Sequence, residues 1–555
     1  MNRQHAFTPT EPADGENCHN VAALLQHHAQ RMPNRLAVSA VARSGSARGS
    51  RVTRTFRELE CESDHLAWAL QKAGIVKGTR TLLMVPPGSE FVAIWFALLK
   101  VGAITILIDP GMGRKHLLTC IEEVQPEALV GIPLAVALRH IARRTFRTVR
   151  VCLSVGSRTQ LPFGSIDALS QPAYPIAPAT EQSDAAIVFT TGSTGIPKGV
   201  LCSHGTFHAH ISLLKSHFVV TSEDVGLPAF LPFALYCVAM GTAAILPDID
   251  PRKPAAADPA KMVALLQTHN VSYSFGSPAF WGPVARYCVA NKIELPQLTR
   301  VILFGAPVSE DVHRALAQVL PNGDSYTPYG ATEALPVTSI SGSEIVCDTS
   351  SATRQGKGVC VGKPMPGTSI RIIELSDQPI AALNEAREAA PGQIGEIVVS
   401  GPQVTLSYYG RPAQTALAKI RDGARIWHRM GDVGYVDSAG RLWFCGRKNH
   451  RVETGRETLF SVPCEAVFNA HPEITRSALV GVGPAGSAEP VLVVEGRFPR
   501  AVEQRLRHEL LALGRSKPHT AAIQRILFHP QFPVDFRHNA KIIREELAAW
   551  AATVA

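Results

Sequence analysis

The sequence lacks a cysteine framework and any apolar segment long enough to cross a membrane. Its 11 cysteines are scattered singly, and no CxxC pair occurs. This pattern argues against a disulfide scaffold or a cysteine-held metal and favours reduced thiols in a cytoplasm. The longest apolar runs, residues 92–99 and 234–247, fall short of the roughly 20 residues that a transmembrane helix needs. Residues 1–16 are polar and contain no apolar signal-peptide core, so we expect a cytoplasmic protein without a transmembrane segment.

The clustered basic charge of a nucleic-acid-binding protein is also missing. The formal net charge is +9, but the 55 basic residues are spread along the chain among 46 acidic ones. The densest basic stretch, residues 139–150, is short. We therefore expect no nucleic-acid partner. A mild basic excess suits anionic substrates such as ATP and carboxylates.

What the chain does contain predicts a large α/β protein. Hydrophobic residues make up 46% of the 555 residues and charged residues 18%, which is ample for a sizeable core. Buried strands are expected at residues 81–85, 103–108 and 128–132, with helices at 90–101 and 115–124 between them. This alternation predicts a parallel sheet with helices on both faces.

Further along the chain the same pattern returns and then changes. Strands and helices alternate again from residue 206 to 305, whereas short alternating β runs fill 362–446. We expect a large N-terminal domain at 18–446, built of two doubly wound sheets plus a small β-barrel-like layer. Residues 447–555 read as a small C-terminal α+β domain, and residues 1–17 as a flexible tail.

A glycine-rich loop is the strongest local signal. Residues 189–200 read FTTGSTGIPKGV and follow an apolar strand. Glycines let backbone N–H groups converge on an anion, while hydroxyls and a lysine add donors and charge. The lysine is not followed by Ser or Thr in a GxxxxGK frame, so the loop is not a Walker A motif. We expect the phosphates of a nucleotide to bind here, at Thr190, Thr191, Gly192, Ser193, Thr194, Gly195 and Lys198.

This loop resembles the phosphate loop of the adenylate-forming superfamily, which includes acyl-CoA synthetases and luciferases. Further stretches match the superfamily in the same order from about residue 20 onward. The resemblance implies that the protein uses ATP and Mg²⁺ and forms an acyl-adenylate. Two readings from other classes stay open: a kinase or ATPase that releases ADP, and an inactive scaffold module of an assembly.

The resemblance also assigns the adenine side of the nucleotide site. Residues 304–307 read FGAP and resemble the turn that lies along the adenine, where small residues let the base approach the backbone. Residues 329–333 read YGATE and resemble the motif whose tyrosine stacks on the base. The implied adenine contacts are Gly305, Ala306, Pro307, Tyr329 and Gly330.

Five residues carry the remaining roles that the resemblance implies. Thr332 would reach the α-phosphate, and Glu333 is a hard oxygen ligand suited to Mg²⁺. Asp432 would accept hydrogen bonds from both ribose hydroxyls, and Arg447 would contact ribose or phosphate. Lys541 resembles the adenylation lysine, which stabilises the charge that builds between the carboxylate and the α-phosphate.

The sequence departs from the acyl-CoA synthetase pattern at several places. Arg456 stands where relatives carry a small residue beside the pantetheine path, so it either obstructs CoA, swings away from it or pairs with the phosphate of CoA. Residues 231–236 lack the aromatic–histidine pair that gates thiolation in many relatives. Ala540 replaces a usual glycine, and Asn449 stands at the family's hinge position between the domains.

Within the superfamily, the chain is most similar to the OleC-type β-lactone synthetases of bacterial long-chain olefin biosynthesis. The similarity includes residues 201–207, 275–281 and 534–541. It implies that a long-chain 2-alkyl-3-hydroxy acid (a β-hydroxy acid) is adenylated and then closed by its own 3-hydroxyl, since tethering gives a high effective molarity. Other enzymes of olefin biosynthesis are the implied partners. A long-chain fatty acyl-CoA synthetase is the alternative.

The substrate pocket and the base for ring closure are less defined. Aromatic residues near the phosphate loop either line the pocket or belong to the core: Phe233, Tyr236, Phe275, Phe280 and Trp281. His204 and His538 are candidate bases by their neighbourhoods, or structural residues.

Overall fold

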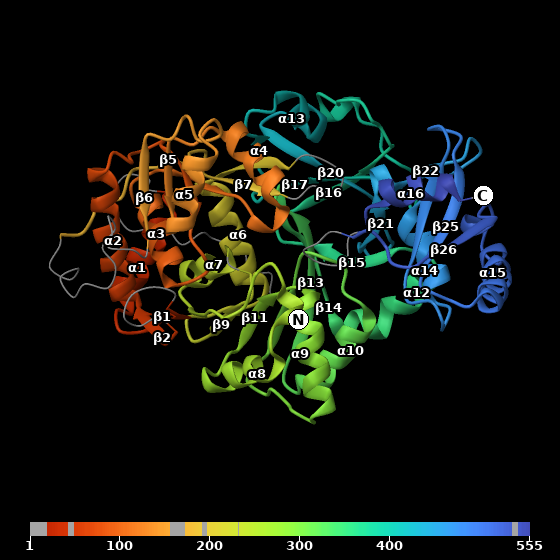
Figure 1. The fold of residues 1–555 in the computed structure, drawn as a ribbon, viewed down its shortest axis with the longest axis horizontal. Coiled ribbons are helices and arrows are strands. Elements are labelled where there is room, and N and C mark those ends of the chain that lie inside the picture. Colours follow the sequence, from red (N-terminus) through yellow and green to blue (C-terminus); the bar gives the residue numbers. More distant parts are fainter. Residues whose placement is uncertain are drawn as a thin grey trace, which may run out of the picture.

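A computed structural model describes most of the chain, namely residues 19–42, 49–155, 172–190, 197–230, 232–534 and 542–554. Two large sheets and one small sheet, flanked by helices, make up the fold (Figure 1). The expected mixed α/β class is confirmed. Among the described helices, none combines the length and the apolar character that crossing a bilayer requires.

The first sheet has seven strands in the order β18-β8-β7-β4-β3-β5-β6. Its parallel part consists of β3 (Arg80–Met84), β4 (Ile104–Leu107), β5 (Ala128–Gly131), β6 (Val151–Ser154) and β7 (Asp184–Thr190). The strands β8 (Lys198–Ser203) and β18 (Ser407–Tyr408) continue it in antiparallel fashion. Helices α3 (Ser89–Lys100), α4 (Arg114–Val124) and α5 (Pro133–Ile141) make the crossovers. Most of α3 is buried, as its apolar sequence predicts.

The second sheet has fourteen strands and holds most of the candidate site. Its central part consists of β9 (Val225–Pro228), β10 (Ala243–Ile245), β11 (Tyr273–Gly276), β12 (Arg300–Leu303) and β13 (Asp324–Ala331), which are parallel. At one edge lie β1 (Leu36–Val41) and β2 (Arg51–Thr55). The flanking helices are α1 (Ala22–Arg31), α2 (Phe56–Lys72), α6 (His204–His217), α7 (Pro232–Met240), α8 (Pro259–Thr268), α9 (Pro278–Ala290) and α10 (Glu310–Val319).

The β layer expected at residues 362–446 is continuous with this second sheet. The strand β14 (Ala334–Ser341) pairs with β13 on one side and with β15 (Val359–Pro364) on the other. Beyond β15 the order is β21 (Leu442–Arg447), β20 (Arg425–Val436), β17 (Gly395–Ser400) and β16 (Ser369–Ile373), all antiparallel. The strand β19 (Lys419–Asp422) pairs with β20, and α13 (Pro412–Ala418) precedes it. Nucleotide motifs on β13 and β20 are thereby joined through one hydrogen-bonded sheet.

The chain after β21 builds the third sheet. It contains β24 (Ser477–Val482), β25 (Glu489–Glu495) and β26 (Arg525–His529), with helices α14 (Ser461–Asn469), α15 (Arg500–Arg515) and α16 (Arg544–Thr553). A short hairpin of β22 (Val452–Glu453) and β23 (Thr458–Leu459) precedes it. These elements, blue in Figure 1, lie at the opposite end of the molecule from α1 and α2.

Candidate active site

A cavity of about 2180 Å³ lies between the large sheets and the C-terminal elements. It is lined by ten of the predicted nucleotide-site residues: Lys198, Gly305, Ala306, Pro307, Tyr329, Gly330, Thr332, Glu333, Asp432 and Arg447. The predicted residues Thr191, Gly192, Ser193, Thr194, Gly195 and Lys541 lie outside the described residues, as does the side chain of Thr190. Motifs more than 100 residues apart in sequence therefore face one space.

Asp432 is the centre of a buried polar group in this cavity. The Tyr329 hydroxyl donates a hydrogen bond to Asp432 Oδ2 at 2.6 Å, and Arg447 Nη1 lies 2.8 Å from Oδ1. Burial and the adjacent carboxylate raise the pKa of Tyr329 well above its ordinary value, so the phenol keeps its proton. The same carboxylate raises the pKa of Arg447. Asp432 is thus an ionised acceptor held between two donors.

Glu333 lies in the turn between β13 and β14, beside the first sheet. The Tyr408 hydroxyl donates to Glu333 Oε1 at 2.7 Å. Lys198 Nζ lies 5.0 Å from the centroid of the Tyr408 ring, a cation–π distance. Tyr408 therefore connects the lysine after the phosphate loop with the predicted Mg²⁺ ligand, a link that the sequence did not reveal.

A buried lysine, Lys419, supports the turn that contains Glu333 through hydrogen bonds to Thr405. Thr405 donates two hydrogen bonds to the backbone carbonyl of Glu333, at 2.9 Å from its N–H and 3.2 Å from Oγ1. Lys419 Nζ in turn donates to the Thr405 carbonyl and, at 3.3 Å, to its Oγ1. Burial lowers the pKa of Lys419 to about 7, and the Glu333 carboxylate opposes that shift. These hydrogen bonds fix the position of the backbone at Glu333.

The turn after β12 forms the other wall of the nucleotide side. Gly305 has a φ of 91°, a left-handed conformation that a residue with a Cβ rarely adopts. Phe304 stacks on Phe233, with ring centroids 4.7 Å apart. The aromatic pair anchors the turn from the apolar side and leaves Gly305 exposed to the cavity.

The apolar part of the cavity confirms two of the five predicted pocket aromatics. Phe233 and Tyr236 line it. Phe275, Phe280 and Trp281 do not belong to its lining and are at most 1% exposed, so the core alternative holds for these three. They are core residues, since each is packed among the apolar side chains between the strands and helices of the second sheet.

Of the two alternatives for His204, candidate base or structural residue, the structure supports the structural one. His204 Nδ1 accepts a hydrogen bond from the Val21 N–H at 3.1 Å, and His204 does not line the cavity. His538 lies outside the described residues. His210, which the sequence did not single out as a base, lines the cavity and is buried.

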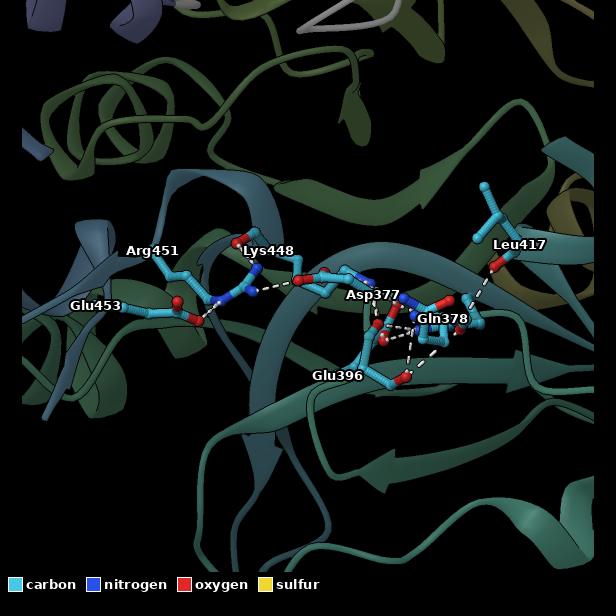
Figure 2. Close-up of polar contacts among 9 residues, drawn as sticks. Asp377, Gln378, Glu396, Leu417, Lys448, Arg451 and Glu453 are labelled. Carbon is cyan, nitrogen blue, oxygen red and sulfur yellow. Dashed lines mark hydrogen bonds and ion pairs between the residues drawn. The ribbon is translucent and has the colours of Figure 1, made fainter. Parts of the chain in front are cut away.

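A network of ion pairs surrounds the predicted hinge at Asn449 (Figure 2). Lys448 Nζ lies 3.2 Å from Glu396 and 3.6 Å from Asp377. Arg451, on the other side of Asn449, lies 2.6 Å from Asp377 and 2.8 Å from Glu453. Asp377 therefore bridges the two residues that flank the hinge position.

Glu396 of this network also takes part in a fully buried ion pair. Arg429 contacts Glu396 at 2.6 Å, and their side chains are 2% and 1% exposed. Arg429 also donates to the carbonyls of Gln378 and Leu417 at 2.7 and 3.2 Å. The ion pairs around the predicted hinge position are thus anchored in the antiparallel layer by Arg429 and Glu396.

Arg456 lies in the exposed turn between β22 and β23 and is not part of the cavity lining. In this arrangement it does not block the cavity. The described residues 232–236 contain no histidine. A histidine of another helix, His210 of α6, lies close to this segment, with its Nδ1 3.0 Å from the Tyr236 hydroxyl oxygen.

The comparisons with known proteins agree with the fold and with this geometry. The model of the AMP-binding enzyme family matches residues 25–409, well over half of the chain. The chain belongs to this family.

Two relatives are similar over nearly their whole length. An olefin β-lactone synthetase of Stenotrophomonas maltophilia is 44% identical over 546 residues, covering 96% of this chain and 98% of the relative. A second, from Xanthomonas campestris pv. campestris, is 42% identical over 555 residues, covering 96% and 97%. These similarities confirm the resemblance to the OleC-type branch.

A solved structure shares the fold at low sequence identity. The O-succinylbenzoate coenzyme A synthetase of Bacillus subtilis, in complex with AMP, superposes with a TM-score of 0.72 at 18% identity. The superposition covers 94% of this chain and 97% of that one. The whole described arrangement, C-terminal elements included, therefore shares the fold of that synthetase.

Proposed function

We propose that this protein uses ATP to adenylate a long-chain 2-alkyl-3-hydroxy acid and then closes the adenylate to a β-lactone, in long-chain olefin biosynthesis. AMP and pyrophosphate are the other products. The observation that carries the proposal is the 44% identity, over nearly the full chain, with an olefin β-lactone synthetase. The nucleotide side of the cavity supports adenylation, and its apolar side supports a lipid-like acid.

In this proposal the nucleotide is held from three directions. Asp432 accepts the ribose hydroxyls while Arg447 balances its charge, and Tyr329 lies along the adenine opposite residues 305–307. Residues 190–195 and Lys198 bind the phosphates. The support is geometric, because the described members of this set line one cavity. Thr332 and Lys541 contact the α-phosphate and the acid, where negative charge builds.

Glu333 suits an Mg²⁺ ion that keeps most of its ligands from phosphate and water. Within the described residues, no group of three His, Cys, Asp or Glu side chains could hold a metal. Mg²⁺ at nucleotide sites commonly takes only one or two carboxylates, so the single carboxylate fits. When bound, the ion neutralises phosphate charge.

We further propose that residues 447–555 form a C-terminal domain that rotates about Asn449 and delivers Lys541. Two neighbours of that lysine, Ile542 and Arg544, line the cavity. Their position supports a route by which Lys541 reaches the acid. We place the reaction in the cytoplasm, with other enzymes of olefin biosynthesis as partners; all the cysteines in the described part of the chain are free.

Product analysis tests the proposal. The purified protein is incubated with a synthetic 2-alkyl-3-hydroxy acid and Mg·ATP, with and without CoA, and the products are identified by mass spectrometry. We expect β-lactone and AMP in both samples. The alternative, a long-chain fatty acyl-CoA synthetase, predicts acyl-CoA in the second sample and no lactone in either.

A further inference from the structure

His210 and Tyr236 form a polar pair in the otherwise apolar wall of the cavity. His210 lies on α6 and Tyr236 on α7, and His210 Nδ1 is 3.0 Å from the Tyr236 hydroxyl oxygen. Both line the cavity, but His210 is only 5% exposed whereas Tyr236 is partly exposed to it. Of the two, the tyrosine is the one that a substrate can touch.

The surroundings of the imidazole define the direction of the hydrogen bond. The ring has the backbone of Gln403 as a second polar neighbour. Because Nδ1 contacts Tyr236, we assign the Gln403 carbonyl to Nε2, which is buried and makes no full hydrogen bond within the described residues. A carbonyl at that side favours the tautomer with hydrogen on Nε2, so Nδ1 accepts from the Tyr236 hydroxyl. The oxygen lone pairs of Tyr236 remain for a donor in the cavity.

Tyr236 lines the same cavity as the predicted catalytic residue Glu333. Cys202 lines this cavity as well. Tyr236 packs edge-on against Phe233, which stacks on Phe304 beside the adenine turn. Tyr236 is therefore connected through Phe233 to the turn at residues 304–307, which lines the same cavity.

We propose that Tyr236 accepts the proton of the substrate's 3-hydroxyl during lactone closure while its own proton passes to Nδ1 of His210. This inference rests on the proposed function and assigns the base that the reaction needs. Tyr236 is the catalytic residue of the pair, and His210 is a positioning residue that stores the proton.

The step balances. The O–H bond of the 3-hydroxyl breaks, and its oxygen forms a bond to the carbonyl carbon of the acyl-adenylate. The bond from that carbon to the phosphate oxygen breaks, and AMP leaves with the electron pair. The proton ends on His210, where burial disfavours the charged ring and the Gln403 carbonyl partly offsets that effect. Burial lowers the pKa of His210 to about 4, so the ring is neutral near pH 7 and begins the step with a free lone pair.

Two substitutions test the relay. Tyr236→Phe removes the hydroxyl and keeps the ring. His210→Asn keeps an acceptor for Tyr236 but cannot take up a proton, so a merely structural hydrogen bond would survive it. The matched controls are Tyr273→Phe, which removes a buried hydroxyl bonded to Thr242, and His208→Gln, on the same helix and bonded to the His19 carbonyl. Neither control residue lines the cavity.

The measured quantity is the fraction of the acyl-adenylate that becomes β-lactone rather than free acid. Pyrophosphate release and the KM for the 3-hydroxy acid should stay within about threefold of wild type in all four variants. Lactone formed per AMP should fall about 100-fold in Tyr236→Phe and His210→Asn, with free acid appearing instead, because general-base catalysis is worth that much. Both controls should keep the wild-type ratio.

The outcomes separate the relay from the function on which it rests. Suppose that wild type forms lactone. If His210→Asn and Tyr236→Phe then keep the wild-type ratio of lactone to AMP, the proposed proton relay through Tyr236 to His210 is wrong. If wild type releases pyrophosphate but forms no lactone, the proposed function fails and the relay with it. Should either variant unfold, adenylation of an unhydroxylated fatty acid reveals it, since that activity would be lost as well.

Discussion

Asp432 and Arg447 face each other across the neighbouring strands β20 and β21, with 2.8 Å between carboxylate and guanidinium. The antiparallel register places them opposite one another, so the ion pair is part of the sheet. Asp432 is 4% exposed. A nucleotide that enters the cavity therefore meets an acceptor already oriented by Arg447 and Tyr329.

Asp432→Asn should weaken use of ATP. The amide cannot accept from Tyr329 and ribose as the carboxylate does, and Arg447 loses its counter-charge. We expect kcat/KM for ATP, measured by pyrophosphate exchange, to fall about 10- to 100-fold. Asp437→Asn, which changes an aspartate paired with Arg441 outside the cavity lining, should stay near wild type. Equal losses in both variants would contradict a nucleotide role for Asp432.

Lys541→Ala should lose most of the adenylation activity and keep ATP binding. In our proposal the lysine stabilises negative charge that builds in the transition state, so its loss should lower kcat about 100-fold or more. ATP affinity from equilibrium binding should change little. Lys261→Ala, on the exposed face of α8, is the control. Unchanged turnover of Lys541→Ala would remove this lysine from the mechanism.

Lys419 should make the stability of the protein depend on pH. Burial lowers its folded-state pKa to about 7, from an ordinary value of 10.5. Between these values the unfolded chain binds more protons than the folded one, so stability rises with pH in this window. Relative to Lys419→Met, wild type should gain about 1.4 kcal/mol of unfolding free energy per pH unit from pH 7.5 to 9.5.

Urea denaturation at several pH values measures this difference. The control Lys363→Met removes an exposed lysine and should keep the wild-type pH dependence. Parallel curves for wild type and Lys419→Met would show that the buried amine stays charged.

Two carboxylates of the ion-pair network around Asn449 should contribute very differently to stability: Glu396 strongly and Asp377 weakly. Glu396→Gln leaves the buried Arg429 and the partly buried Lys448 without their shared counter-charge, so we expect a loss of about 3–5 kcal/mol of unfolding free energy. Asp377 is 61% exposed, and Asp377→Asn should cost less than about 1 kcal/mol. Urea denaturation compares the two, and a reversed order would contradict the assignment.

Much of the fold and of the nucleotide side could be predicted from the sequence. The alternation of apolar strands and helices predicts the first sheet, and the motifs around Tyr329 and Asp432 predict residues that do lie together. The Tyr408–Glu333 and Lys419–Thr405 contacts could not be predicted, because their partners meet only through tertiary packing. The sequence left open whether Phe280 and Trp281 belong to the pocket or the core, because the pattern of an aromatic residue in a helix is the same in both cases.

Isotope tracing of the acid's oxygens tests the central claim most directly. The 2-alkyl-3-hydroxy acid is labelled with ¹⁸O in its carboxylate and incubated with Mg·ATP and no CoA. Our account predicts that AMP gains a single ¹⁸O, while the lactone keeps the other in its carbonyl and has an unlabelled ring oxygen from the 3-hydroxyl. Unlabelled AMP with a labelled ring oxygen would mean that the alcohol is activated instead, and would contradict it.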